Sequence, residues 1–408
     1  MGNRVIFHSR AGTLVWGALA VCLFGWLSYH SLRMAFADWF FRQNTIASVQ
    51  RAIRWERDNA NYYSWLASLQ EFAGQDPNGA LLTSVKLNPW DSSTWIRLAE
   101  HAEAREDQVS AERYLLRAAA IDRQFSPRWA LMNFYFRRGR QERFWFWTTK
   151  ALGIGYGDLA PVFDLCWKMT ADAGLVRRAI PNRRVLLAQY LAYLMATDRL
   201  QVAVKVAEDL SGQATESERS ALLTFCERSI ATRNAASALA VWNAMCERKL
   251  LQYRPLHPDA GVSLTNGDFA IPFSSQGFDW KVTRVPEVEL SSFPGGVAFT
   301  LSGAQPGDCE LVIQYLPVLS RRRYNLHFQY RMGAASMHGI GWAVTPALPE
   351  TPLQELASDN DQWHDGTYQF GPVDVPLCRL ALKAVRIPGN TRPEGRFSLR
   401  NVRLELTK

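Results

Sequence analysis

Residues 92–125, SSTWIRLAEHAEAREDQVSAERYLLRAAAIDRQF, carry the pattern that decides the fold of the first half of the chain. Apolar side chains recur there at three- and four-residue spacing on both sides of a polar stretch, which predicts two helices joined by a short turn. The pattern recurs at an offset of 34 residues, so that Trp95 matches Trp129 and Leu98 matches Met132. An internal period of this length predicts stacked helical hairpins.

The packing positions of this copy resemble those of a tetratricopeptide repeat, and the resemblance covers residues 60–150. These positions are Trp95, Leu98, Ala99, Ala111, Leu115 and Ala118. A large ring on one helix faces small side chains on the next, so the two helices can pack closely. The resemblance implies a concave surface that docks a partner protein, lined in this copy by Ser93, Ile96, Glu100 and Glu103. The alternative is that the array only spaces the last domain from the membrane.

The segment 35–254 is rich in Ala, Leu and Arg, and we expect it to be an all-α, tetratricopeptide-like solenoid. Helix-breaking residues separate its helix-length pieces, at 74–77, 88–89, 126–127, 153–157 and 181–182. After Phe163 the repeat register fades, and helices are predicted at 158–175, 183–211, 216–231 and 235–249.

An uncharged stretch near the N-terminus, AGTLVWGALAVCLFGWLSY at residues 11–29, predicts a membrane-spanning helix. A helix of this length spans roughly 28 Å, close to the hydrocarbon thickness of a bilayer. We expect a transmembrane anchor at 11–32 after a cytoplasmic tail at 1–10. A cleaved signal peptide is the alternative, because Ala35-Phe36-Ala37 has the form of a cleavage site. The length of the apolar run and the position of Arg33 favour the uncleaved anchor.

The numbers of Lys and Arg residues near the two ends of this span are nearly equal, so the positive-inside rule barely decides its orientation. A short N-terminal tail normally stays in the cytoplasm, which sends the rest of the chain outward. We therefore expect a single-pass protein of the bacterial inner membrane, with most of the chain in the periplasm.

The net charge of +8 is mild for 408 residues, and its short arginine runs are typical of solvated helix ends. This argues against nucleic acid as a partner. The six cysteines are too scattered for a metal site, although Cys309 and Cys378 could form one disulfide. The sequence holds no P-loop, nucleophile elbow, HExxH motif or dinucleotide-binding turn in a credible setting. We expect no catalytic residue, no cofactor and no metal.

From residue 258 to 408 the composition changes to Val, Phe and Tyr runs broken by Gly and Pro about every ten residues, as in an all-β sandwich. Strands are predicted at 297–301, 310–316, 324–331, 341–345, 367–370, 378–387 and 397–406. In the third of these strands, apolar and polar side chains alternate cleanly. The apolar set should face the core, and the polar set, Asn325, His327, Gln329 and Arg331, should face outward.

The domain opens with Asn266-Gly267-Asp268-Phe269, followed by Gly277-Phe278-Asp279-Trp280, and closes with Asn401-Val402-Arg403-Leu404. These two end motifs resemble those of jelly-roll carbohydrate-binding modules of the galactose-binding-like kind. The resemblance covers most of residues 262–406 and implies the fold more strongly than a ligand.

In sugar-binding members of that group, aromatic rings stack on pyranose faces and polar groups bind the hydroxyls. The outward set of Asn325, His327, Gln329 and Arg331 could supply the polar groups, with Trp342, Trp363 and Tyr368 as candidate platforms. Trp342 is in phase with Val344, so it could instead belong to the core. Polar neighbours surround Trp363, which favours a surface position. The acidic loop 359–365 could hold calcium, but its spacing matches no defined calcium loop.

These features favour a non-catalytic scaffold or assembly factor of the cell envelope. Its solenoid would dock a protein partner and its β-domain would contact glycan, in the synthesis or export of an exopolysaccharide or cell-surface polysaccharide. A purely protein-binding, membrane-tethered scaffold is the second interpretation. A glycan-modifying enzyme whose site the sequence does not reveal is a third.

Overall fold

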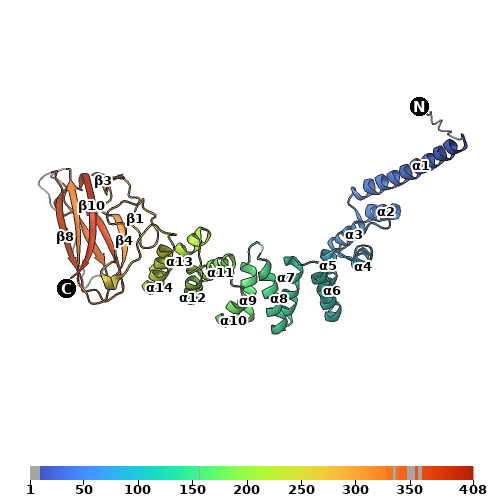
Figure 1. Ribbon diagram of the computed structural model, residues 1–408, viewed down its shortest axis with the longest axis horizontal. Coiled ribbons are helices and arrows are strands. Elements are labelled where there is room, and N and C mark those ends of the chain that lie inside the picture. The colour runs from blue at the N-terminus through green and yellow to red at the C-terminus, as the bar shows by residue number, and fades with distance from the viewer. Residues whose placement is uncertain (1–9, 156, 334–336, 347–353, 357–360, 408) are drawn as a thin grey trace, which may run out of the picture. The chain divides into compact units, whose positions relative to one another are not determined.

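The computed structural model describes residues 10–155, 157–333, 337–346, 354–356 and 361–407. Within them, α-helices follow one another as far as Glu247, and β-strands begin at Lys281 (Figure 1). The predicted fold class is confirmed: an apolar N-terminal helix, an all-α array of hairpins and an all-β sandwich. The chain divides into two compact units, Met1–Pro181 and Asn182–Lys408, and each is described by itself.

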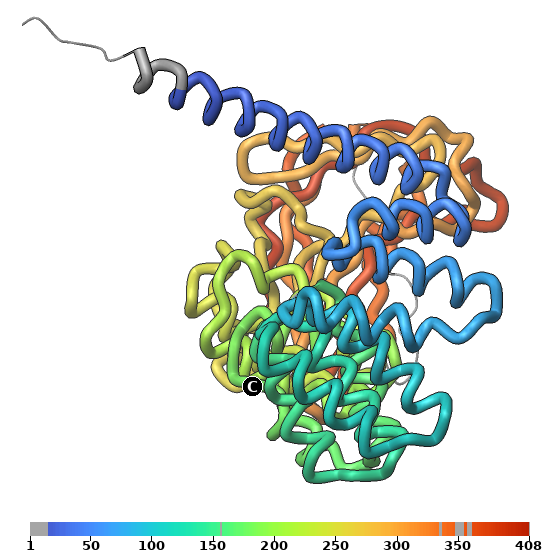
Figure 2. Tube along the Cα trace, turned by 90° about the vertical axis from the view of Figure 1, so that its right-hand side faces the viewer, coloured from blue at the N-terminus to red at the C-terminus, as the bar shows by residue number. Residues whose placement is uncertain are grey.

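In the first unit, each helix packs against the next helix along the chain. The tube in Figure 2 traces this path. They are α1 (Arg10–Phe41), α2 (Ile46–Trp55), α3 (Ala60–Phe72), α4 (Asn78–Leu87), α5 (Ser92–Ala104), α6 (Gln108–Ile121), α7 (Phe125–Arg137), α8 (Gln141–Ile154), α9 (Ala160–Met169) and α10 (Ala173–Ala179). Carboxylates cap the helices of the best repeat, because Asp91 accepts from the Ser93 N–H and Asp107 from the Ser110 N–H. These caps fix the starts of α5 at Ser92 and of α6 at Gln108.

The hairpin of α5 and α6 packs a large ring against small residues. Ala111 and Ala118 of α6 are fully buried, and Leu98 of α5 lies beside them in the interior. The ring of Trp95 is half-buried, with its centroid 5.7 Å from that of Tyr114. Its Nε1 donates to the Pro89 carbonyl over 3.1 Å, which ties α5 to the end of the preceding hairpin.

Helix α1 is the one described helix that is long and apolar enough to cross a membrane, by length and composition. The most apolar stretch of its segment Val15–Phe41 is not buried inside the protein. The predicted tail at 1–10 lies outside the described residues apart from Arg10.

The second unit contains four long helices followed by the sandwich. The helices are α11 (Arg184–Ala196), α12 (Leu200–Ser211), α13 (Arg219–Ala231) and α14 (Ala235–Glu247), with the short 3-10 helices η1 (Glu216–Glu218) and η2 (Pro258–Ala260). The strands are β1 (Lys281–Val282), β2 (Val288–Phe293), β3 (Gly296–Ser302), β4 (Asp308–Pro317), β5 (Tyr324–Met332), β6 (Ile340–Thr345), β7 (Gln354–Glu355), β8 (His364–Phe370), β9 (Leu377–Val385) and β10 (Glu394–Leu406).

The described strands form two five-stranded antiparallel sheets, with the orders β1-β4-β9-β6-β7 and β2-β3-β10-β5-β8. The side chains of β5 alternate between buried and half-buried, as predicted from its sequence. The inward residues of both sheets form one core, in which Trp280 and Trp342 are the largest side chains and are fully buried. The polar face of the sheet β2-β3-β10-β5-β8 therefore points away from this core.

Cys309 and Cys378 are buried free thiols. On the ladder between β4 and β9, Cys309 pairs with Ala384 and Cys378 pairs with Leu316. Cys309 and Leu316 are seven positions apart on β4, which is roughly 24 Å along a strand. A disulfide between them is therefore excluded by distance.

The last helices of the second unit are joined to the sandwich by specific contacts. Glu227 of α13 accepts hydrogen bonds from the backbone N–H of Gly277 and from the Lys281 ammonium group. The fully buried ring of Trp242 on α14 packs against Phe278, with ring centroids 5.7 Å apart. These contacts combine helical and β elements in one compact unit.

Candidate binding surfaces

A groove of about 360 Å³ lies between α5 and α7 in the first unit. Its lining residues are Ile96, Ala99, Glu100, Glu103, Leu115, Ser126, Trp129, Ala130, Asn133 and Arg137. Three of the four predicted docking residues, Ile96, Glu100 and Glu103, therefore meet in one groove. The fourth, Ser93, is exposed outside this lining, where its hydroxyl donates to Asp91 in the helix cap over 2.6 Å.

The two carboxylates of this α5–α7 groove differ in their partners. Glu103 is held by Arg137 of α7, with an Oε2–Nη2 distance of 2.6 Å, and it also lies 3.5 Å from Arg138. Burial raises the pKa of Glu100, and no hydrogen bond or ion pair is recorded for its carboxylate among the described residues. Glu100 is thus the carboxylate available to a cation that enters the groove, whereas Glu103 connects neighbouring hairpins.

The sequence period could have identified the partner of Glu103. Arg137 stands 34 residues after Glu103, so the two occupy equivalent positions of successive repeats. Trp129 stands the same distance after Trp95 and forms part of the groove wall. The 34-residue period that relates packing residues of successive repeats therefore relates this charge pair as well.

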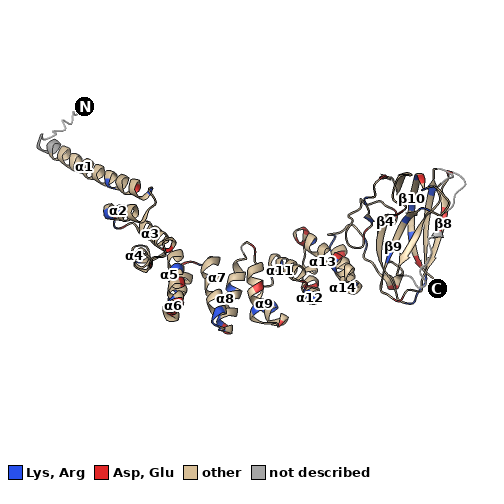
Figure 3. Cartoon of the chain, turned by 180° about the vertical axis from the view of Figure 1, so that it is seen from behind, with Lys and Arg blue, Asp and Glu red and all other residues tan. Residues whose placement is uncertain are grey.

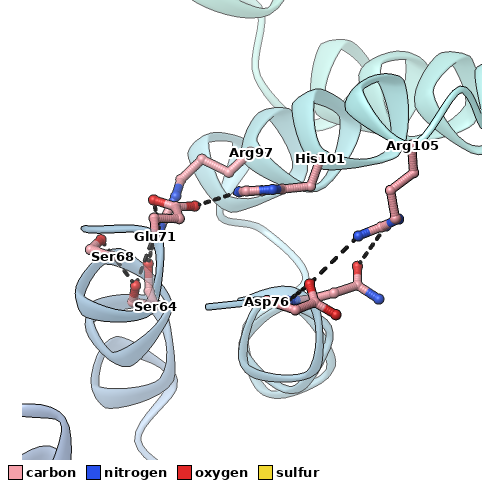
Figure 4. A network of polar contacts seen from close by, with 8 residues as sticks. Ser64, Ser68, Glu71, Asp76, Arg97, His101 and Arg105 are labelled. Atoms are coloured by element: carbon pink, nitrogen blue, oxygen red, sulfur yellow. Dashed lines mark hydrogen bonds and ion pairs between the residues drawn. The ribbon is translucent and has the colours of Figure 1, made fainter. Parts of the chain in front are cut away.

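A second polar network connects α3 and α5 (Figure 4). Arg97 donates to the Ser64 carbonyl over 3.0 Å and to the Glu71 carboxylate over 2.9 Å. His101 lies 2.7 Å from the other oxygen of Glu71. Burial alone would raise the pKa of Glu71, but the hydrogen bonds and charges of Arg97 and His101 together hold it below its usual value. This network fixes the relative position of successive hairpins.

The outer face of the sheet β2-β3-β10-β5-β8 is polar. A shallow hollow of about 310 Å³ lies on it, lined by His327, Phe328, Gln329, Asp365, Gly366, Thr367, Asn401, Arg403 and Glu405. Two of the four predicted polar residues, His327 and Gln329, belong to this lining. Asn325 and Arg331 lie on the same face of β5, one at each end of the set. Figure 3 shows that basic and acidic positions are interspersed over the sandwich.

Hydrogen bonds hold the side chains of this sheet hollow in place. Gln329 donates to Asp365 over 2.9 Å, and its oxygen accepts from both Arg400 and Asn401, each over 2.9 Å. The register of β10 against β5 shifts between Arg400 and Arg403, and Asn401 has a φ of 53° at that bulge. The bulge brings Asn401 to the outer face, which the sequence did not reveal because the pairing register is not local.

Trp363 lies on the same outer face but is not a free ring. It is half-buried, and the Arg400 guanidinium carbon lies 4.0 Å from the centre of its ring. The corresponding distance from Arg331 is 5.4 Å, and the ring of Phe293 lies 6.0 Å away. Part of the aromatic surface proposed for sugar stacking is thus already in contact with arginine.

The other two candidate rings are core residues. Trp342 is fully buried between Trp280 and Phe328, with centroid distances of 6.3 Å and 5.6 Å. Tyr368 is 1 % exposed on the inward face of β8. Neither ring can present a face to a sugar, which corrects their inclusion among the candidate platforms.

The proposed calcium loop at 359–365 lies partly outside the described residues, because 357–360 are not described. Among the residues that the structure describes, no group of three or more His, Cys, Asp or Glu side chains is arranged to hold a metal ion. A larger hollow of about 610 Å³ lies beside the segment that enters the sandwich, and none of the predicted site residues lines it.

No family model matches the chain, and no curated protein sequence matches it. Similar solved structures include one described as "CBM4 structure and function", with 12% identity over 36% of this chain and 100% of that chain and a TM-score of 0.28. A putative sugar binding protein from Bacteroides thetaiotaomicron has 11% identity over 35% of this chain and 99% of that one, with a TM-score of 0.27. PilW, a type IV pilus biogenesis factor, has 16% identity over 47% of this chain and 93% of its own, with a TM-score of 0.25.

Proposed function

We propose that the chain is a non-catalytic, membrane-tethered scaffold whose helical array docks a segment of a partner protein. Helix α1 would be the uncleaved anchor, with residues 35–408 outside the cytoplasm of a bacterial cell. The observation that carries the docking function is the α5–α7 groove, in which an apolar wall of Ile96 and Trp129 adjoins the carboxylate of Glu100, which forms no hydrogen bond or close ion pair within the described part of the chain.

This α5–α7 groove suits an extended or helical segment that presents an apolar side chain beside a Lys or Arg. The apolar side chain would displace water from Ile96 and Trp129, and the cation would pair with Glu100 at the edge of the groove. Glu103 is already paired with Arg137, so it contributes less to an incoming charge.

Site-specific crosslinking in native membranes tests this function. A photoreactive phenylalanine derivative at Ile96 should give a discrete adduct, and the same group at the exposed Val109 of α6 should not. Glu100→Lys should abolish the Ile96 adduct, whereas Glu106→Lys, on the exposed turn between α5 and α6, should leave it unchanged. Equal adducts from both positions, or an Ile96 adduct insensitive to Glu100→Lys, would contradict the proposal.

The anchor and its orientation have their own measurement. The intact mass of the membrane-extracted protein should include residues 1–37, and a C-terminal phosphatase fusion should be active. A mature N-terminus at Asp38 would remove the anchor, and a C-terminal fluorescent protein that matures in the cytoplasm would reverse the orientation.

A second candidate function, contact with glycan, is favoured by the sheet hollow around Gln329. Amide, imidazole, carboxylate and guanidinium groups line it, and such groups bind sugar hydroxyls. This would suit a role in the synthesis or export of an exopolysaccharide or cell-surface polysaccharide. Without it, the chain would be a purely protein-binding scaffold.

Titration of the whole chain with soluble polysaccharides tests the glycan contact. Arg403→Ala should weaken binding at least several-fold, because Arg403 lines the sheet hollow and has no recorded ion pair among the described residues. Arg284→Ala is the matched control, since Arg284 is exposed outside this hollow. If no polysaccharide binds up to millimolar sugar, the protein-binding alternative takes its place.

A further inference from the structure

Helix α1 is longer than a bilayer requires. Its 32 residues correspond to roughly 48 Å, whereas the hydrocarbon core is about 30 Å thick. If the span begins near residue 11, it ends near His30, and Arg33 lies at the boundary. The last turns of α1, from Arg33 to Phe41, then continue into the headgroup layer and beyond it. This step rests on the proposed role of α1 as an anchor.

Exposed aromatic rings gather on that continuation and on the helix that folds back along it. Phe36 and Trp39 of α1 are 48% and 59% exposed, and Trp55 at the end of α2 is 41% exposed. The rings of Phe36 and Trp55 stack with centroids 5.3 Å apart. Because α2 starts at Ile46 just after α1 ends, this contact shows that α2 returns toward the level of Phe36.

The heights of Phe36 and Trp55 match the interfacial layer, because Phe36 lies about 4.5 Å beyond Arg33 along the helix axis. The backbone of Trp39 lies about 9 Å beyond Arg33, just past this layer, but helical side chains lean back toward the N-terminus and so toward the layer. Half of the difference between the full bilayer and its hydrocarbon core is about 5–7 Å, and Trp and Tyr are enriched at that depth. The stacked Trp55 shares the level of Phe36, although it comes 22 positions after Arg33 in sequence.

Two exposed arginines lie next to these aromatic rings. Arg54 and Arg57 flank Trp55, both are exposed, and neither has a recorded carboxylate partner among the described residues. By contrast, the Arg42 guanidinium pairs with Asp38 over 2.7 Å. Unpaired guanidinium groups beside amphipathic rings suit the phosphates of lipid headgroups.

We infer that Phe36, Trp39, Arg54, Trp55 and Arg57 form a juxtamembrane collar that lies in the lipid headgroup layer. The hairpin of α1 and α2 is then a second membrane contact and not a surface free for partner proteins. A lipid surface is favoured over a second copy of the chain because Phe36 and Trp39 are exposed on the same helix as the exposed apolar residues of the span, at the end where the span leaves the hydrocarbon core.

Nitroxide labels on the full chain in nanodiscs of phosphatidylethanolamine and phosphatidylglycerol test this collar. The exposed native Cys22 reports the span, since the other five cysteines are buried. In a Cys22→Ser background, Arg54→Cys reports the collar with its rings intact, and Val109→Cys, at a position 79% exposed on α6, reports bulk water. Power saturation with oxygen and with a polar nickel complex gives the depth of each label.

The Cys22 label should be deepest, the Arg54 label intermediate and the Val109 label fully aqueous. Adding Trp39→Ser and Trp55→Ser should move the Arg54 label toward water. If the Cys22 label is aqueous, the anchor itself fails. If Cys22 is deep but the Arg54 label matches Val109, the collar alone is wrong. An Arg54 label shielded from both reagents and dipolar-broadened would instead place a second copy on this surface.

Discussion

The backbone of Gly277 lies directly against the indole ring of Trp242. A Cβ atom on Gly277 would be 2.4 Å from Cζ3 of that ring, and the residue has a φ of +59°. Trp242 belongs to α14 and Gly277 to the segment that enters the sandwich, so this contact joins the last helical hairpin to the β-domain. Side chains at Gly277 are therefore excluded both by space and by backbone conformation.

Gly277→Ala should destabilise residues 182–408 by roughly 2–5 kcal/mol. The left-handed backbone conformation accounts for about 1–2 kcal/mol of this, and overpacking against the ring for about 1–3 kcal/mol. Urea unfolding of this unit gives the free energy. Gly389→Ala is the control, because Gly389 also has a positive φ of +90° but meets no atom within 4 Å. Equal losses in the two variants would mean that the contact with Trp242 adds nothing.

Trp95→Ala should lower the stability of the helical array by roughly 1–3 kcal/mol. This is less than the cost of removing a fully buried ring, because Trp95 is half-buried. The loss arises from its packing against Tyr114 and from the hydrogen bond to Pro89. Trp90→Ala is the matched control, since that ring is 72% exposed. Thermal melts followed by circular dichroism compare them, and indistinguishable melting temperatures would mean that the Trp95 contacts do not stabilise the hairpin.

The network in Figure 4 should make the array sensitive to acid. The pKa of Glu71 is lower in the folded chain than its usual value, because Arg97 and His101 outweigh the opposing effect of burial. Its stabilising effect is therefore complete above the unfolded pKa of about 4.3 and is lost as the pH falls through the lower folded value. The difference in melting temperature between the wild type and Glu71→Gln should therefore be larger at pH 5.5 than at pH 3.5, shrinking as the pH falls below about 4. A difference independent of pH would contradict the assignment.

The α5–α7 groove was predictable because a repeat converts sequence spacing into spatial position. Ile96, Glu100 and Glu103 lie at three- and four-residue spacing on one helix, so they share one face wherever that helix packs. The same 34-residue period brings Arg137 to Glu103. Local periodicity is enough for these contacts, because each hairpin meets only its neighbours.

The sheet surface was less predictable, because alternation shows which residues share a face but not which face is inside. Trp342 and Val344 share a face, and packing against Trp280 shows that this face is inward. The contact between Trp363 and Arg400 depends on the pairing of β10 with β5 and on a bulge in β10. Neither the pairing nor the bulge has a local sequence signal, so the sequence could not show that arginine covers part of the ring.

Truncation of two tryptophans of the sandwich should lower the free energy of unfolding by different amounts. The comparison distinguishes a core residue from a residue of the candidate binding surface. Trp280 is fully buried and its Nε1 donates to the Asn266 carbonyl over 3.0 Å, so Trp280→Ala should cost about 3–5 kcal/mol in urea unfolding of residues 182–408. Trp363 is half-buried on the outer face, so Trp363→Ala should cost less than about 2 kcal/mol.

If the sheet hollow binds glycan, Trp363→Ala should also weaken polysaccharide binding by the whole chain, because it removes the ring that positions Arg331 and Arg400. A Trp363→Ala variant that unfolds as readily as Trp280→Ala would make this ring part of the core. A folded variant with wild-type affinity for a polysaccharide would remove Trp363 from the binding surface.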